Sequence, residues 1–226
     1  TTSLYNLTVN KSGGQALTVS MPVTVTGVLD MTLGNIFTST NSILTLGNSS
    51  AVPGSLSWTS GNIVGPFRRY FINGATTGNA GLFPVGTAAY NRYAQVDFSS
   101  TPGSDQYLTV WYKLGAPLTQ ASIPLYNGLP LTTQDNQLVQ NYSADGYWNV
   151  DPTASNYTSS ITAAPYSMTL YANNLNGMVT PMITRIIKAS GSNTAQNHHV
   201  QWQGAGVHTP IAGGTSPVAF AITSTN

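Results

Sequence analysis

Five short segments within roughly the first 60 residues are near-copies of one another, and this repetition restricts the folds open to the chain. Each contains a threonine between two apolar residues. The segments are LTVN (residues 7–10), LTVS (17–20), VTVTG (23–27), DMTLGN (30–35) and LTLGN (44–48). One such strand cannot bury its apolar face alone, whereas stacked copies bury it together. The region therefore predicts a degenerate repeat, either a short β-solenoid or a tight meander.

After residue 60 the repeat gives way to longer segments in which apolar and polar residues alternate. These segments are RYAQVDF (92–98), QYLTVWYK (106–113), YSMTLYA (166–172) and MITRIIK (182–188). In the second of them, Leu108, Val110 and Tyr112 would share one face of a strand. The composition agrees with strands, since the chain has 30 Thr, 20 Asn and no Glu. The sequence predicts an all-β chain, with a repetitive region over residues 1–64 and an antiparallel, jelly-roll-like β-sandwich over residues 65–226.

Charge is scarce, and this excludes several classes of protein. Seven Lys or Arg and six Asp give a net charge of +1, too little to neutralise the phosphates of a nucleic acid. No apolar run reaches the ~18 residues that a membrane-spanning helix needs. Cysteine is absent, so disulfides and thiol chemistry are excluded. Because little repulsion keeps copies apart, such a chain is suited to dense packing against itself.

The order of the motifs resembles that of large secreted, adhesin-like surface proteins of Bacteroidota. The motifs are LYNLTVNKSGG (4–14), the repeats of residues 23–48, GPFRRYF (65–71), FPVG (83–86), RYAQVDF (92–98), YW (147–148) and FAI (220–222). The resemblance implies a protein that is secreted, extracellular or on the cell surface, without assigned catalysis. Members of this family typically continue into a C-terminal sorting domain for type IX secretion, so we expect that domain to have been removed or to lie beyond these residues. The family supplies no ligand and no site residues.

Patterns of catalytic residues are weak in this sequence. Asp145 and Asp151 flank GYWNV, and glycosidases use two carboxylates, but Asp145-Gly146 is also a favoured turn pair. His198 and His199 are adjacent, so on a strand they would point to opposite faces and could not readily share a metal. GXSXG and GXXXXGK motifs are absent. The sequence therefore predicts a protein that is not an enzyme.

The sequence predicts no cofactor, with calcium as the alternative. The side chains of QDNQ (134–137) offer the oxygen ligands that calcium takes, but without the spacing of an EF-hand loop. The aromatic residues allow two interpretations, a platform for sugars or rings buried in a sandwich core. The four tryptophans are Trp58, Trp111, Trp148 and Trp202.

An arginine pair interrupts the apolar segment GNIVGPFRRYF (61–71). Alternation along this strand places Arg69 on the same face as two phenylalanines, and Arg68 on the opposite face. We expect Arg69 to be the inward residue and a structural charge. It then needs backbone carbonyls or a carboxylate partner, for which Asp97 and Asp105 are the alternatives. Arg68 is expected to be exposed or stacked on a ring.

Two terminal segments are predicted to form strands that could complete the sheet of a neighbouring copy. They are SLYNLTV (3–9), with Leu4, Tyr5, Leu7 and Val9, and PVAFAITS (217–224), with Val218, Phe220 and Ile222. The sequence thus predicts a non-enzymatic extracellular structural protein, a subunit of a cell-surface fibre or adhesin. Its partners would be copies of itself in a homopolymer or surface array. The alternative is a carbohydrate-binding module of a larger secreted protein, with surface glycans as partners.

Overall fold

The computed structural model describes residues 2–49, 51–71, 81–98, 106–115 and 145–152, together with shorter stretches. The shorter stretches are residues 125–126, 129–130, 138, 143, 166–172, 175, 188–189, 202–203, 207–210 and 218–224. Every regular element among the described residues is a β-strand, which confirms the all-β prediction.

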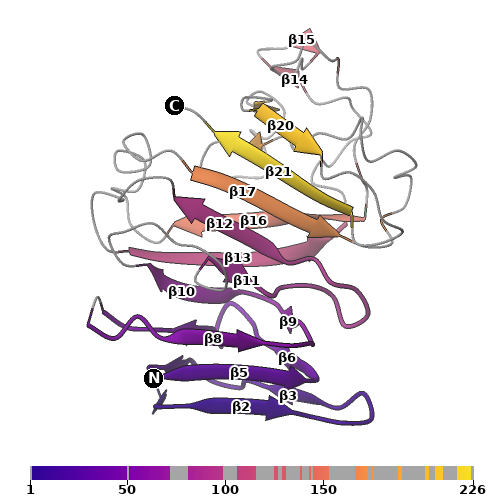
Figure 1. The fold of residues 1–226 in the computed structure, drawn as a ribbon. Coiled ribbons are helices and arrows are strands. Elements are labelled where there is room, and N and C mark those ends of the chain that lie inside the picture. Colours follow the sequence, from indigo (N-terminus) through magenta and orange to yellow (C-terminus); the bar gives the residue numbers. More distant parts are fainter. Residues whose placement is uncertain are drawn as a thin grey trace.

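The N-terminal region is a β-solenoid of about three coils, stacked at the bottom of Figure 1. The first coil contains β1 (Thr2–Leu4), β2 (Leu7–Asn10) and β3 (Ala16–Thr18); the second contains β4 (Val23–Val25), β5 (Val28–Leu33) and β6 (Asn35–Phe37); the third contains β7 (Leu44–Leu46), β8 (Ser55–Trp58) and β9 (Ile63–Val64). Corresponding strands pair in parallel from coil to coil. In a meander, neighbouring strands would be antiparallel, so the solenoid prediction is confirmed and the meander alternative is wrong.

The register between coils explains why the repeat looks irregular in the sequence. Thr2 pairs with Val23, Val23 with Leu44 and Leu44 with Phe67, so successive coils advance by 21, 21 and 23 residues. On the neighbouring face Leu7 pairs with Leu29, and Leu29 with Leu56. The faces therefore absorb loops of different length while like residues stay stacked.

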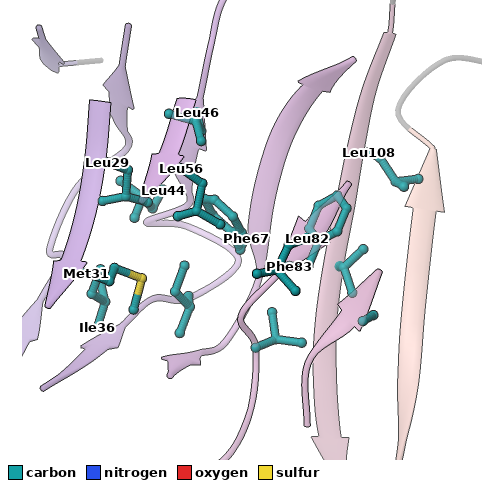
Figure 2. Packing of buried hydrophobic residues seen from close by; sticks show 14 of the residues in the cluster. Leu29, Met31, Ile36, Leu44, Leu46, Leu56, Phe67, Leu82, Phe83 and Leu108 are labelled. Carbon is teal, nitrogen blue, oxygen red and sulfur yellow. The ribbon is translucent and has the colours of Figure 1, made fainter. Parts of the chain in front are cut away.

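The interior of the solenoid is a set of apolar columns, one residue per coil. Leu29, Met31, Ile36, Leu44 and Leu46 are fully buried. Figure 2 shows these side chains grouped together, with Leu56 beside them and Phe67 and Phe83 continuing the cluster. Burial of this kind contributes about 25 cal/mol per Å² of apolar surface and is the main stabilising term of such a stack.

The GNI tripeptides at residues 34–36 and 61–63 form stacked corners. Gly34 and Gly61 both have positive φ, and a Cβ at Gly61 would collide with the carbonyl oxygen of Gly34. Glycine is required there because the backbones approach closely in a left-handed conformation. Asn35 Oδ1 accepts the Asn62 amide at 2.8 Å, so the asparagines link one corner to the next.

The sheet that begins with β1, β4 and β7 continues beyond the solenoid. It adds β10 (Phe67–Phe71), which is parallel to β7, and then β13 (Gln106–Leu114) and β16 (Gly146–Pro152), which are antiparallel. Val64 and Phe67 are separated by a Gly-Pro corner, so GNIVGPFRRYF contains two strands on different faces. This sheet crosses the predicted boundary at residues 64 and 65.

A second, antiparallel sheet has the strand order β11-β12-β17-β21-β20. Its strands are β11 (Leu82–Phe83), β12 (Ala94–Phe98), β17 (Tyr166–Ala172), β20 (Val207–Pro210) and β21 (Val218–Ser224). Two short pairs complete the described strands, β14 (Leu125–Tyr126) with β15 (Leu129–Pro130), and β18 (Lys188–Ala189) with β19 (Trp202–Gln203). In Figure 1 these elements lie above the coils.

The predicted strands after residue 64 have different outcomes. The strand at residues 166–172 is confirmed, and Leu108, Val110 and Tyr112 are all buried, as alternation predicts. The segment 182–188 lies almost entirely outside the described residues. Buried side chains from both sheets, among them Val110 and Val96, join one cluster with the solenoid interior. The jelly-roll-like sandwich stays a prediction.

Candidate functional site

The first coil presents three strand edges at one end of the solenoid. Among the described residues, β1, β2 and β3 are each the outermost strand of their sheets. In β1, the Thr2 amide and the Leu4 carbonyl bond to the second coil. Since alternate residues of a parallel strand bond to the same side, the Ser3 backbone groups point away from the solenoid. This coil thus offers an unpaired row of donors and acceptors.

The apolar interior is incompletely covered at this end. Leu4, Leu7 and Leu17 are only half-buried, although each occupies an inward column. Their stacking partners in the second coil, Val25, Leu29 and Ile36, are fully buried. Val9 is 2% exposed, so one column is closed even in the first coil. A neighbour placed on this surface would bury apolar side chains as well as pair backbone groups.

Exposed apolar residues surround this end of the solenoid. Tyr5 is 76% exposed at the corner between β1 and β2, and Met21 is 53% exposed at the last corner of the coil. The three edge strands read TSL, LTVN and ALT, without a charge or a proline. Exposed edges are usually protected by such residues. We define β1, β2 and β3 with Tyr5 and Met21 as the first-coil surface.

At the opposite end of the solenoid, later segments of the chain pair with β7 and β9, whereas β8 is the outermost described strand of its sheet. β10 covers β7, and residues 84–86 cover β9 through hydrogen bonds from Ile63 to Pro84 and from Gly86 to Ile63. On the remaining face, the Trp58 ring packs against Tyr93, 5.2 Å between centroids. The Trp58 indole also donates to the Gly61 carbonyl at 2.8 Å.

No protein-family model, curated protein or solved structure matches this chain. The resemblance to secreted proteins of Bacteroidota therefore stays a prediction. None of the described residues belongs to a helix long and apolar enough to cross a membrane.

The predicted N-terminal assembly strand, residues 3–9, is divided by a corner into β1 and β2, which belong to different sheets. The C-terminal assembly strand has a different setting. Val218, Phe220 and Ile222 lie on β21, which pairs with β17 on one side and β20 on the other. Both edges of β21 are thus occupied within the chain, and it offers no unpaired row to a neighbour. Of the two predicted assembly segments, the N-terminal one therefore has open edges and β21 does not.

The structure places the two arginines as the alternation predicts. Arg69 is 4% exposed and stands in the column of Leu4, Val25 and Leu46. Its guanidinium donates to the Leu82 carbonyl and lies 5.8 Å from the Phe83 ring centroid. Burial lowers the pKa of Arg69 to about 9, so the charge persists at neutral pH.

The other charges near the junction have separate partners. Arg68 is half-buried on the opposite face, where Nε donates to Thr109 Oγ1 at 3.2 Å and the guanidinium lies 5.9 Å from the Tyr107 ring. Asp97 accepts two hydrogen bonds from Gln95 Nε2. Asp105 lies outside the described residues. A backbone carbonyl, one of the two kinds of partner expected for Arg69, is thus present at Leu82.

Sequence reasoning missed a second buried arginine. Arg92 is 2% exposed, with its guanidinium 5.3 Å from the Tyr112 ring and 5.4 Å from the Tyr90 ring. Its carbonyl accepts the Trp148 indole at 2.6 Å, and Trp148 packs edge-on against Tyr112. The sequence did offer a signal for this residue. The chain has only seven cations, so an arginine next to an aromatic residue, as Arg92 is next to Tyr93, is a candidate for burial.

The structure does not bring the candidate catalytic carboxylates together, and it does not describe the candidate metal ligands. Asp145 precedes β16 and Asp151 lies near its end, so their backbones are roughly 20 Å apart along the strand. Glycosidase carboxylates lie within about 10 Å of each other. His198, His199 and residues 134–137 fall outside the described residues. Among the residues that the structure describes, no three His, Asp, Glu or Cys side chains are grouped to hold a metal.

Proposed function

We propose that this chain is a non-enzymatic, extracellular structural protein that assembles with copies of itself through the first-coil surface. Three outermost strands side by side, with half-buried leucines between them, carry the proposal. A coil of a second copy supplies backbone hydrogen-bond partners for the open strand edges and an apolar surface that buries the leucines. The jelly-roll-like arrangement of the later strands belongs to the same proposal, as the part that closes the other end.

The contact between two copies is head to head. A first coil cannot add to all three strands at the other end, because β7 and β9 already pair with later segments of their own chain and only β8 is outermost there among the described residues. Two first coils related by a two-fold axis pair their strands in the antiparallel direction and bury each other's leucines. A fibre needs a second contact as well, and β16 and β20 are the outermost described strands where we expect it.

Secretion to the cell surface is part of the proposal. The chain has no cysteine, almost no net charge and many Thr and Asn residues. Low charge leaves little repulsion between copies at high local concentration. Detection of the protein on intact cells, by surface proteolysis or antibody labelling, tests this part separately.

The assembly is tested by light scattering and electron microscopy of the purified chain. Ser3→Pro removes an amide that faces the open side while leaving the bonds of Thr2 and Leu4 to the second coil. We expect this variant to remain monomeric with a nearly unchanged melting temperature. Ser3→Ala, which keeps the amide, should assemble as the unaltered chain does.

A second variant places a charge on the same surface. The half-buried Leu4→Lys side chain can reach water in the monomer, but it would be desolvated in the head-to-head contact. We expect it to weaken association about tenfold or more. A strictly monomeric unaltered chain at high concentration, or assembly that neither substitution changes, would contradict the proposal.

A further inference from the structure

The outer face of β10, β13 and β16 carries a cluster of aromatic and charged side chains that lies outside the first-coil surface. Along β13, Leu108, Val110 and Tyr112 point into the core. Trp111 and Lys113 therefore lie on the outer face, where both are half-buried. The antiparallel register places Asn149 opposite Trp111, and Tyr147 opposite Lys113.

The rings on this face are arranged around cations. Lys113 Nζ lies 4.6 Å from the Trp111 ring centroid and 5.8 Å from the Tyr147 ring centroid. Nearer the solenoid, Tyr70 and Tyr107 meet edge to face at 5.0 Å, and Arg68 lies over the Tyr107 ring. We call this set the aromatic face; it consists of Arg68, Tyr70, Tyr107, Trp111, Lys113, Tyr147 and Asn149.

The charges on the aromatic face point to an acidic ligand. Two of the seven cations of the chain are here, and within the described residues neither forms an ion pair with a carboxylate. The exposed carboxylate of this face, Asp151, stands opposite Thr109 in the cross-strand row of Arg68, so the two cations outnumber one carboxylate. A single-stranded nucleic acid would also stack on rings, but it needs a continuous row of cations for its phosphates.

We propose that the aromatic face binds an acidic polysaccharide, one that contains uronic acids. The apolar face of a pyranose ring packs on Trp111 and Tyr147, as a sugar's C–H bonds do on an aromatic ring. Carboxylates of the polysaccharide pair with Lys113 and Arg68, and these two cations keep their contacts with the aromatic rings. The Asn149 amide donates to and accepts from sugar hydroxyls. This proposal stands apart from the head-to-head contact, because none of these residues belongs to the first-coil surface.

The test is calorimetric titration of the full chain with alginate oligosaccharides. A neutral β-glucan oligosaccharide and a single-stranded oligothymidine serve as comparison ligands. We expect binding to alginate that weakens with added salt, as ion pairs at an exposed surface do, and much weaker binding to the other two. Absence of alginate binding, equal binding of the neutral glucan, or preference for oligothymidine would each overturn the proposal.

Matched variants locate the site. Trp111→Ala should weaken alginate binding about tenfold or more, and Lys113→Gln should weaken it several-fold and reduce its salt dependence. Tyr5→Ala and Lys11→Gln, an exposed ring and an exposed cation on the first coil, should leave it unchanged. Melting temperatures show whether each variant is folded, and Trp111→Phe keeps a ring if Trp111→Ala does not fold. Equal losses of alginate affinity in the first-coil variants would show that the site is not on the aromatic face. Assembly of the Trp111→Ala variant should be the same as that of the unaltered chain.

Discussion

The two ends of the solenoid differ in how their edges are satisfied. At the N-terminal end, repeated strands stop with their edges open, and the interior leucines are half-covered. At the other end, two faces continue through backbone pairing, with β10 on the first and residues 84–86 on the third. On the second face the Trp58 ring packs against Tyr93, while β8 remains the outermost described strand of its sheet. The comparison shows that a repeat can generate coils but cannot end them. Termination needs residues that break the pattern, here Arg69, Pro66 and a group of aromatic rings.

The largest expected effect tests whether the coils are held at their corners. Gly61→Ala must accommodate a positive φ and a collision with the Gly34 carbonyl, so we expect it to lower the free energy of unfolding by more than about 3 kcal/mol. Gly13 also has positive φ but has no atom within 4 Å of an added Cβ. Gly13→Ala should therefore cost only about 1 kcal/mol. Equal losses in urea denaturation would show that the corners are not tightly stacked.

A second pair of substitutions compares the interior at the two levels. Leu29 and Leu7 are partners in register, but Leu29 is fully buried whereas Leu7 is only half-buried. Leu29→Ala should cost about 3 kcal/mol, and Leu7→Ala about 1 kcal/mol in the monomer. The difference should shrink at protein concentrations that allow assembly, because assembly buries Leu7. A difference that does not depend on concentration would argue that the first-coil surface stays uncovered.

The arginine pair tests the closed end. Arg69→Ala removes the donor to the buried Leu82 carbonyl and leaves a space in the core, so we expect a loss of about 2 kcal/mol. Arg68→Ala, on the outer face, should lower stability by about 0.5 kcal/mol. Melting temperatures of the two variants provide the measurement. Equal, small shifts would mean that Arg69 does not support the closed end.

The smallest expected effect is an alkaline loosening of the closed end. Burial raises the pKa of Tyr93, and so does its stacked neighbour Tyr171, 4.1 Å away. Above about pH 10 the unfolded chain releases this proton while the folded chain retains it, so stability falls as the pH rises. Tyr93→Phe should make the fall in unfolding free energy with rising pH less steep, as measured by denaturation at several alkaline pH values. If the dependence of unfolding free energy on pH is the same in the variant, Tyr93 does not cause the alkaline loss of stability.

Sequence reasoning reached the solenoid because coils repeat their chemistry. The apolar-Thr-apolar segments and the two GNI corners are local signals, and the structure places both as stacked units. The inward side of Arg69 also followed from alternation. Parallel pairing did not follow, because a short strand carries no information about the direction of its neighbour. For the same reason the sequence did not reveal that one sheet continues from β7 through β10 into antiparallel strands, or that β21 has both edges paired.

The nearly constant coil length has a geometric consequence. A coil of 21 residues returns the chain to the same place on the first face, one strand spacing further along the axis. Duplicating such a coil would lengthen the rod by about 4.8 Å and leave its cross-section, its corners and its closed end as they are. The number of coils therefore sets the distance between the first coil and the later strands, and this distance can change only in steps of one coil.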